Sequence, residues 1–494
     1  MHHATRSKRL IVALSGAGLV AASMLTGPAS ASVAADEPTS TPVPIATPEG
    51  QLMSYIVNAK HANAGQTRLV ESAVKAAGGE VVQSWPQIGV VVAHSTKADF
   101  RADVVELDSG HAVDSVGASR TAAVSEGTPG TGGATANGQL SVGGWLAGQD
   151  VTAAEAVTLD PREGEQWDMT QIKADKAHEI TDGSSDVLVG VLDSGIDSTH
   201  PDLAPNVDLA NSVNCTEAGR PDTAAGAAEP TTSAHGTHVA GTIAAARNGV
   251  GIVGVAPGVT MASVKVVNDD GYIYPEYAVC GFVWAAEHGM DVTNNSYYVD
   301  PFEFWCDDQP DQHAAKEAVR RAVTFSTKKG VVHAAAAGNA AYDLANKTTN
   351  TSSPNDGTAV NRTLNSTCHD IPTELDGVVT TSSITQAGTL SSFSNRGLGV
   401  IDVAAPGSAI LSTVPGGYAL FSGTSMASPH AAGVLALLKS THPDATPAQL
   451  IDMLRAQATD TACSTTTRGA ACVGPVEDNS YFGEGVIDAL AAVS

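Results

Sequence analysis

Three polar clusters beyond residue 190 each contain a side chain that could take part in covalent catalysis. Asp193 ends an apolar run, His235 opens a helical pattern, and Ser425 lies in a loop that leads into another helix. A carboxylate, an imidazole and a hydroxyl in the chain order Asp, His, Ser form one of the three known orders of a catalytic triad. The conjunction of the three clusters predicts acyl transfer through a serine nucleophile.

Each cluster also has a structural explanation when it is taken alone. Asp193 could cap a turn, although burying its carboxylate at a strand end is costly without a partner. His235 and His238 are three residues apart with no glutamate beside them, whereas the zinc motif needs histidines four apart, so zinc is disfavoured. We expect His238, and likewise His430, to be structural.

Ser425 precedes Pro429 in the pattern of a helix start. Because proline is best tolerated in the first turn of a helix, we expect Pro429 in that turn and Ser425 at the helix N-terminus. The free N–H groups and the dipole there would stabilise the negative charge of a serine alkoxide or a tetrahedral oxyanion. An isolated serine at this place would only cap the helix.

With these clusters, the chain from about residue 166 to its end resembles the subtilisin-like serine proteases, the subtilases. Four stretches carry the resemblance in the family's order: Asp193-Ser194-Gly195-Ile196-Asp197 with His200-Pro201-Asp202, then His235-Gly236-Thr237-His238-Val239-Ala240-Gly241, then Ala337-Gly338-Asn339, and Gly423-Thr424-Ser425-Met426-Ala427-Ser428-Pro429-His430.

The resemblance implies a role for each matching residue. Ser425 would be the nucleophile, His235 the general base and then acid, and Asp193 the group that orients the imidazole. Asn339 would complete an oxyanion hole with the Ser425 N–H. Ser296 and Gly338 would bind substrate. No cofactor is implied for the chemistry.

One segment departs from the family pattern. Ser296 is followed by two tyrosines, so Tyr298 stands where the family usually has a glycine in the wall of the primary pocket. We expect Tyr298 to narrow this pocket and to favour small or slender residues before the scissile bond. The alternative is that the insertion after it swings the loop outward and leaves Tyr298 as surface packing.

The resemblance also raises the question of a structural calcium ion. Asp202 and Asn248 match positions of the family's calcium loop, in which backbone carbonyls of residues 246–252 would supply further oxygens. Alternatively, Asp202 only caps a turn, and Arg247 beside Asn248 opposes a cation. The residues leave both readings open.

The elements that must position these residues alternate along the chain. Strand-like runs at 187–192, 264–267, 291–294 and 330–337 are separated or followed by helical patterns at 235–247, 275–288, 311–328, 425–439 and 447–458. Such alternation predicts an α/β fold, with a mostly parallel sheet covered by helices on both faces, as in subtilisins. Chemistry in such sheets gathers at the carboxyl ends of strands.

The N-terminal third has a different organisation. Residues 1–31 read as a signal peptide cleaved after Ala31, with Ala34 as second choice, and 32–50 as a loose tether. Residues 51–125 show a βαββαβ order, typical of a small ferredoxin-like α+β unit, and resemble the family's inhibitory propeptide. A Gly/Ala-rich linker at 126–160 would precede a catalytic domain at 161–494.

Composition limits the possible partners. The 43% hydrophobic residues suffice for a large core, and the net charge of −26 disfavours nucleic acid and anionic membranes. We expect a secreted monomer without a membrane span, acting on protein or peptide substrates and made as a zymogen that its own propeptide inhibits. Six cysteines in an exported protein suggest three disulfides, for which we predict Cys463 with Cys472, Cys306 with Cys368, and Cys215 with Cys280.

Two other functions remain to be weighed. An α/β-hydrolase esterase also uses Ser, His and Asp, but it needs the order Ser, acid, His and a Gly-x-Ser-x-Gly elbow, whereas Ser425 comes last and Ala427 replaces the second glycine. A catalytically silent, peptide-binding homologue is disfavoured because all four reacting positions are filled.

Overall fold

The computed structural model describes residues 38–108, 111–125, 159–463 and 471–494. The predicted signal peptide and most of the predicted linker lie outside the described residues. None of the described helices is long and apolar enough to cross a bilayer.

Residues 53–118 form the predicted βαββαβ unit. Its strands are β1 (Met53–Ala59), β2 (Glu80–Trp85), β3 (Val90–Ser95) and β4 (Val113–Ala118), and its helices are α1 (Ala64–Ala76) and α2 (Phe100–Asp108). The strands pair in the order β2-β3-β1-β4, and all three pairings are antiparallel. Asn63 starts α1 by accepting a hydrogen bond from the Gln66 N–H, as an N-cap residue does.

An eight-stranded sheet organises the rest of the chain in the order β16-β15-β11-β9-β5-β8-β6-β7. All neighbours are parallel except β6 and β7, which confirms the predicted α/β class. The strands are β5 (Leu188–Asp193), β6 (Val213–Glu217), β7 (Arg220–Asp222), β8 (Thr260–Lys265), β9 (Val292–Asn295), β11 (Val332–Ala336), β15 (Val378–Ile384) and β16 (Val403–Pro406).

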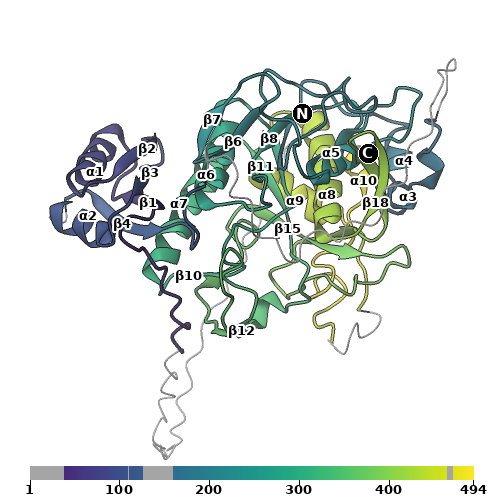
Figure 1. Cartoon of the computed structure of the whole chain (residues 1–494). Helices are drawn as coiled ribbons and strands as arrows, with labels where there is room; N and C mark the ends of the chain where they lie inside the picture. Colours follow the sequence, from purple (N-terminus) through teal and green to yellow (C-terminus); the bar gives the residue numbers. More distant parts are fainter. Residues whose placement is uncertain (1–37, 109–110, 126–158, 464–470) are drawn as a thin grey trace, which may run out of the picture. The chain divides into compact units, whose positions relative to one another are not determined.

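Helices cover both faces of this sheet. On one face α6 (Pro275–Glu287) and α7 (Pro310–Lys328) share a core with the N-terminal unit. On the other face α5 (His235–Ala244), α8 (Thr424–Thr441) and α9 (Pro447–Ala456) form a second core, and the two groups stand on opposite sides of the strands in Figure 1. Smaller elements are α3 (Trp167–Gln171), α4 (Ala174–Ala177), α10 (Ala489–Ala492), the short pairs β10 (Trp305–Cys306) with β14 (Cys368–His369) and β12 (Thr349–Asn350) with β13 (Arg362–Thr363), and the hairpin β17 (Ile410–Val414) with β18 (Gly417–Phe421).

The parallel order brings distant residues to one edge of the sheet. The strands β5, β9 and β11 are neighbours. Asp193 is the last residue of β5, Ser296 follows β9, and Gly338 with Asn339 follows β11 after one intervening residue. Because parallel strands end at the same edge, these side chains gather there.

All three predicted disulfides are present. They join Cys215 to Cys280, Cys306 to Cys368, and Cys463 to Cys472. The second connects the short paired strands β10 and β14, of which β10 lies beside α7.

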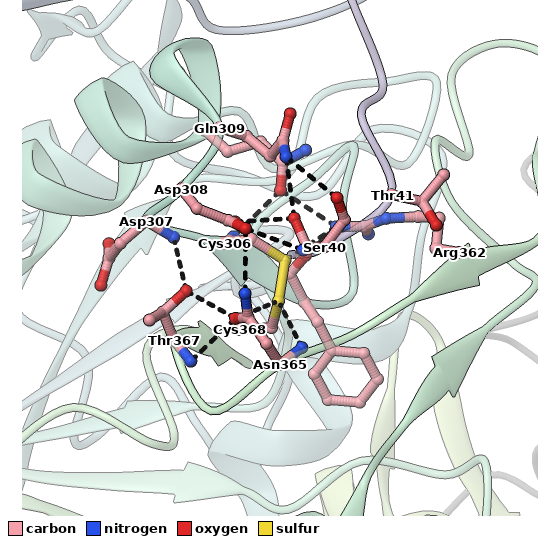
Figure 2. The surroundings of a disulfide bond; sticks show 12 residues. Ser40, Thr41, Cys306, Asp307, Asp308, Gln309, Arg362, Asn365, Thr367 and Cys368 are labelled. Atoms are coloured by element: carbon pink, nitrogen blue, oxygen red, sulfur yellow. Dashed lines mark hydrogen bonds between the residues drawn. A yellow bond between two sulfur atoms is a disulfide. The ribbon is translucent and has the colours of Figure 1, made fainter. Parts of the chain in front are cut away.

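Part of the predicted tether is held next to the Cys306–Cys368 disulfide (Figure 2). The buried Ser40 donates to the Asp308 carboxylate from its backbone N–H at 2.7 Å and from its hydroxyl at 2.6 Å. Thr41 exchanges hydrogen bonds with Thr363. Residues 38–48 contain no helix or strand. The hydrogen bonds of Ser40 and Thr41 nevertheless anchor this segment to the loops that the disulfide joins.

Candidate active site

Asp193 and His235 form a close pair. His235 is the first residue of α5, and its Nδ1 lies 2.8 Å and 2.9 Å from the two carboxylate oxygens of Asp193. Asp193 is itself 1% exposed, and the Ser194 N–H also donates to its Oδ1 at 2.7 Å. The cost of burying this carboxylate is therefore offset by directed hydrogen bonds.

The environment of His235 affects its protonation. Burial disfavours the charged imidazole, but the charge of Asp193 and its hydrogen bond outweigh burial, so the pKa of His235 is raised above its ordinary value. The same carboxylate fixes the tautomer with a proton on Nδ1 and leaves Nε2 free to accept one.

Ser425 is the second residue of α8, as expected for a residue at a helix N-terminus. The prediction that Pro429 stands in the first turn is wrong, because it is the sixth residue of this helix. Proline has no N–H, so the Ser425 carbonyl four residues earlier loses its helical donor. Ser296 replaces it, donating from Oγ to the Ser425 carbonyl at 2.8 Å, while Ser425 Oγ donates to the Ser296 carbonyl at 3.3 Å.

This reciprocal pair belongs to a small network that the sequence did not reveal. Asn294, in β9, donates from its side-chain amide to Ser296 Oγ at 2.9 Å and accepts from Ser428 Oγ at 2.7 Å. The network ties the end of β9 to α8 at Ser425 and at Ser428. It therefore fixes the nucleophile candidate relative to the substrate-binding candidate Ser296.

Asn339 is oriented by its neighbour on α8. Its side-chain Oδ1 accepts hydrogen bonds from the Thr424 N–H at 2.8 Å and the Thr424 hydroxyl at 3.0 Å, so its Nδ2 remains the outward donor. A Cβ atom placed on Gly423 would lie 3.5 Å from both Asn339 Nδ2 and the Ser425 backbone nitrogen. The two nitrogens therefore lie close to the same point beside Gly423, and donors directed into a common space would stabilise an oxyanion.

A pocket adjoins these donors. It is lined by residues from four separate segments: Ser296, Tyr297, Tyr298, Ala336, Gly338, Asn339, Asp370, Thr424 and Ser425. All three predicted substrate-binding residues are thus brought together with Ser425. Tyr298 is among the lining residues, and its hydroxyl accepts a hydrogen bond from Asn355 Nδ2 at 3.1 Å.

The other two histidines of the motifs are built into the core. His238 Nε2 lies 3.0 Å from the Ile410 carbonyl, and its ring stacks on Phe421 with 4.3 Å between the centroids. Burial lowers the pKa of His238 to about 3. His430 bonds to the buried Asp168 at 2.9 Å. These contacts agree with the structural role expected of both histidines.

The predicted calcium residues lie together at the loop of residues 246–252. Asp202 Oδ2 accepts from the Ile252 N–H at 3.0 Å and the Tyr418 hydroxyl at 2.9 Å, whereas its buried Oδ1 has no hydrogen-bond partner among the described residues. Asn248 donates from its side chain to the carbonyl of Pro201 at 3.0 Å.

Two observations at this loop bear on a cation. The positive charge of Arg247 was the feature of the sequence that opposed a cation here. In the structure its guanidinium donates a hydrogen bond to the Glu163 carboxylate at 3.1 Å, so this charge is paired with Glu163. Asp160 accepts from the N–H groups of Asn248 and Gly249, which places a second carboxylate on the loop. The sequence could not reveal Asp160, because it falls at the end of the predicted linker.

Within the described ranges, no group of three or more His, Cys, Asp or Glu side chains is arranged to hold a metal. A calcium ion would thus use Asp202 Oδ1 together with backbone carbonyls, a donor set of hard oxygens that suits it.

Comparison with known proteins places the chain in a family. The model of the subtilase family of peptidases matches residues 184–485. Subtilisin of Bacillus pumilus is 35% identical over 327 residues, covering 66% of this chain and 98% of that protein. Subtilisin E of Bacillus subtilis is 34% identical over the same length, covering 66% of this chain and 70% of that protein.

Solved structures agree at the level of the fold. Fervidolysin from Fervidobacterium pennivorans aligns over 90% of this chain and 61% of its own, with a TM-score of 0.62 and 24% identity. The epidermin leader peptide processing serine protease of Staphylococcus aureus aligns over 90% of this chain and 98% of its own, with a TM-score of 0.64 and 22% identity. The chain therefore belongs to the subtilase family and is a subtilisin-like serine endopeptidase.

Proposed function

We propose that this protein is a secreted serine endopeptidase that cleaves peptide bonds with Asp193, His235 and Ser425 through an acyl-enzyme, and that it is made as a self-processed zymogen. The observation that carries the proposal is the hydrogen-bonded Asp193–His235 pair, and the pocket that Ser425 and Asn339 line supports it. The family match limits the chemistry to peptide hydrolysis.

The first half of the reaction forms the acyl-enzyme. The Ser425 hydroxyl, which donates to the Ser296 carbonyl, turns toward His235 and gives its proton to Nε2 as Oγ bonds to the substrate carbonyl carbon. The resulting oxyanion accepts hydrogen bonds from Asn339 Nδ2 and the Ser425 N–H. The C–N bond then breaks, and His235 returns the proton to the leaving amine.

The second half releases the acid. Water gives a proton to His235 and attacks the acyl carbon, and the second tetrahedral intermediate uses the same two donors. The C–O bond to Ser425 breaks, and Oγ takes back the proton. Asp193 accepts a hydrogen bond from the imidazole throughout and stabilises its charged form.

Zymogen organisation is supported by the contacts of residues 51–125. Arg120, which follows β4, pairs with Glu276 at the start of α6, and both side chains are at most 1% exposed. Ser54 donates to the same carboxylate at 2.9 Å, and Asn58 donates to the Ala314 carbonyl in α7 at 2.8 Å. Buried polar pairing of this extent is typical of a specific interface.

Secretion is supported by two independent features. The sequence begins with basic residues, an apolar run and the small triplet ending at Ala31, as signal peptides do. The three disulfides require an oxidising compartment to persist.

A structural calcium ion completes the proposal. It would bind Asp202 Oδ1 and backbone carbonyls of the 246–252 loop, near Asn248 and Asp160. Its effect would be on stability, because this loop holds no candidate catalytic group.

The direct test of the function is covalent labelling. An organophosphonate with a peptide recognition element is expected to modify Ser425 in the mature wild-type enzyme, and His235→Ala is expected to abolish the modification. Mass spectrometry of the labelled peptide identifies the serine. Absence of labelling in fully processed, folded protein would instead identify a silent peptide-binding homologue.

A further inference from the structure

Asp370 is the acidic residue among the nine that line the pocket beside Ser425. It lies in a loop eight residues before the start of β15, outside the motifs, and is 2% exposed. Its backbone is fixed, because its N–H donates to Glu374 Oε2 at 2.7 Å and its carbonyl accepts from the Glu374 N–H at 2.9 Å. The carboxyl group is therefore held at the pocket by its own loop.

One oxygen of this carboxyl group, the buried Oδ1, has no hydrogen-bond partner among the described residues. The nearby cations are already engaged: Lys347 pairs with Glu374 at 2.6 Å, and Lys316 pairs with Asp307 at 2.9 Å. Burial raises the pKa of Asp370 well above its ordinary value, and the charges of Glu374 and Glu303 add to that effect. A cation that enters the pocket would pair with this buried carboxyl group and lower the free-energy cost of its ionised form.

Asp370 lies next to Gly338 in the pocket lining. A Cβ atom placed on Gly338 would lie 3.6 Å from Asp370 Oδ2, so the carboxyl group is close to this glycine. Gly338 has a positive φ of +100°, and Asn395 Nδ2 lies only 2.3 Å from that Cβ position, so this glycine cannot easily be replaced. Tyr298 also lines the pocket, and we expect its ring to exclude broad side chains.

The pocket also has a defined relation to the scissile bond. It is lined by Ser425 and Asn339, the residues that would hold the carbonyl under attack. The side chain carried by that carbonyl's own residue is the one that reaches the pocket. It is therefore the residue before the scissile bond that meets Asp370.

We propose that Asp370 selects substrates with a slender, positively charged side chain, lysine or arginine, immediately before the scissile bond. This inference rests on the proposed function and names its substrate class. A positively charged substrate side chain pairs with the buried carboxylate. A neutral side chain of the same shape leaves the carboxylate unpaired, so its substrate is cleaved with a lower kcat/KM.

The test compares substrates that differ in charge alone. Tetrapeptide anilides of one sequence end in arginine or its neutral isostere citrulline, and in lysine or its neutral analogue norleucine. For the wild type, kcat/KM is expected to be at least about 30-fold higher for arginine than for citrulline. Asp370→Asn, which keeps the shape and removes the charge, is expected to reduce this ratio to within about threefold of one.

A matched variant controls for long-range charge. Asp376→Asn removes the same charge from an exposed position six residues along the chain and is expected to keep the wild-type ratio. Rates are normalised to the fraction of Ser425 that reacts with phosphonate, so that misfolded protein is not counted.

Two results overturn the inference: a wild-type ratio near one, or a ratio in Asp370→Asn equal to that of the wild type. If Asp370→Asn does not fold, the ratio of kcat/KM for arginine to that for citrulline in the wild type still tests the inference, because a ratio near one contradicts it. Failure of the proposed function is separate, because then no substrate is cleaved and Ser425 takes no label.

Discussion

His235 must be neutral to accept the Ser425 proton, so its ionisation sets the acid limb of activity. Because Asp193 raises the pKa of His235, kcat/KM is expected to rise with pH through a pKa above the ordinary 6.5 and to be lost below it. Asp193→Asn removes the charge that stabilises the imidazolium, so the acid limb is expected to move to lower pH while kcat falls by about 10⁴-fold. The measurement is the pH profile of kcat/KM for both proteins. An acid limb that Asp193→Asn leaves in place would assign the ionisation to another group.

A second prediction at the scale of single residues is that Tyr298 limits the width of the pocket. Tyr298→Gly is expected to raise kcat/KM for an anilide ending in phenylalanine by roughly 10- to 200-fold relative to one ending in alanine. Tyr298→Phe removes only the hydroxyl that accepts from Asn355 and keeps the ring, so it is expected to gain nothing. If the glycine variant also gains nothing on phenylalanine, Tyr298 does not narrow the pocket.

At the scale of elements, the calcium loop can be tested through stability. If a cation binds Asp202 Oδ1, excess chelator is expected to lower the melting temperature, since a ligand at 100 times its Kd stabilises by about 2.7 kcal/mol. Asp202→Asn is expected to remove the chelator effect, whereas Asp186→Asn, on an exposed loop, is expected to retain it. A melting temperature of the wild type that does not respond to chelator contradicts a stabilising ion.

The elements also explain which site residues the sequence could predict. Asp193, His235 and Ser425 stand at the ends of regular elements within motifs rich in glycine, so local pattern alone locates them. Asp370 and Asp160 stand in loops, and their importance comes from residues far along the chain, Gly338 and Gly249 respectively. Pro429 was misplaced because the side chain that compensates for its missing N–H, Ser296, comes from β9's carboxyl end. Contacts between residues so far apart in the chain leave no periodic pattern in the sequence.

At the scale of the whole molecule, the pair of Arg120 with Glu276 is expected to hold residues 51–125 to the catalytic domain. Removing one partner of a buried ion pair typically costs about 3–5 kcal/mol, whereas an exposed pair contributes about 0–1 kcal/mol. In the Ser425→Ala precursor, Arg120→Ala is therefore expected to be far more destabilising in urea than Arg101→Ala, which breaks a more exposed pair with Asp311 at the same interface. Equal effects of the two variants would show that the buried pair is not what secures the interface.

The last prediction concerns how the chain matures. If Ser425 itself cuts the connection to residues 51–125, then Ser425→Ala is expected to accumulate as a precursor that begins near Ser32, whereas the wild type is expected to begin between about residues 124 and 165. Ser422→Ala, at an exposed serine three residues earlier, is expected to mature normally and controls for loss of a hydroxyl near α8. N-terminal sequencing of protein secreted from a host that lacks other extracellular proteases gives both start sites. A fully trimmed Ser425→Ala protein would show that maturation is performed by another protease, and the contacts of Arg120 would then serve folding or inhibition without self-cleavage.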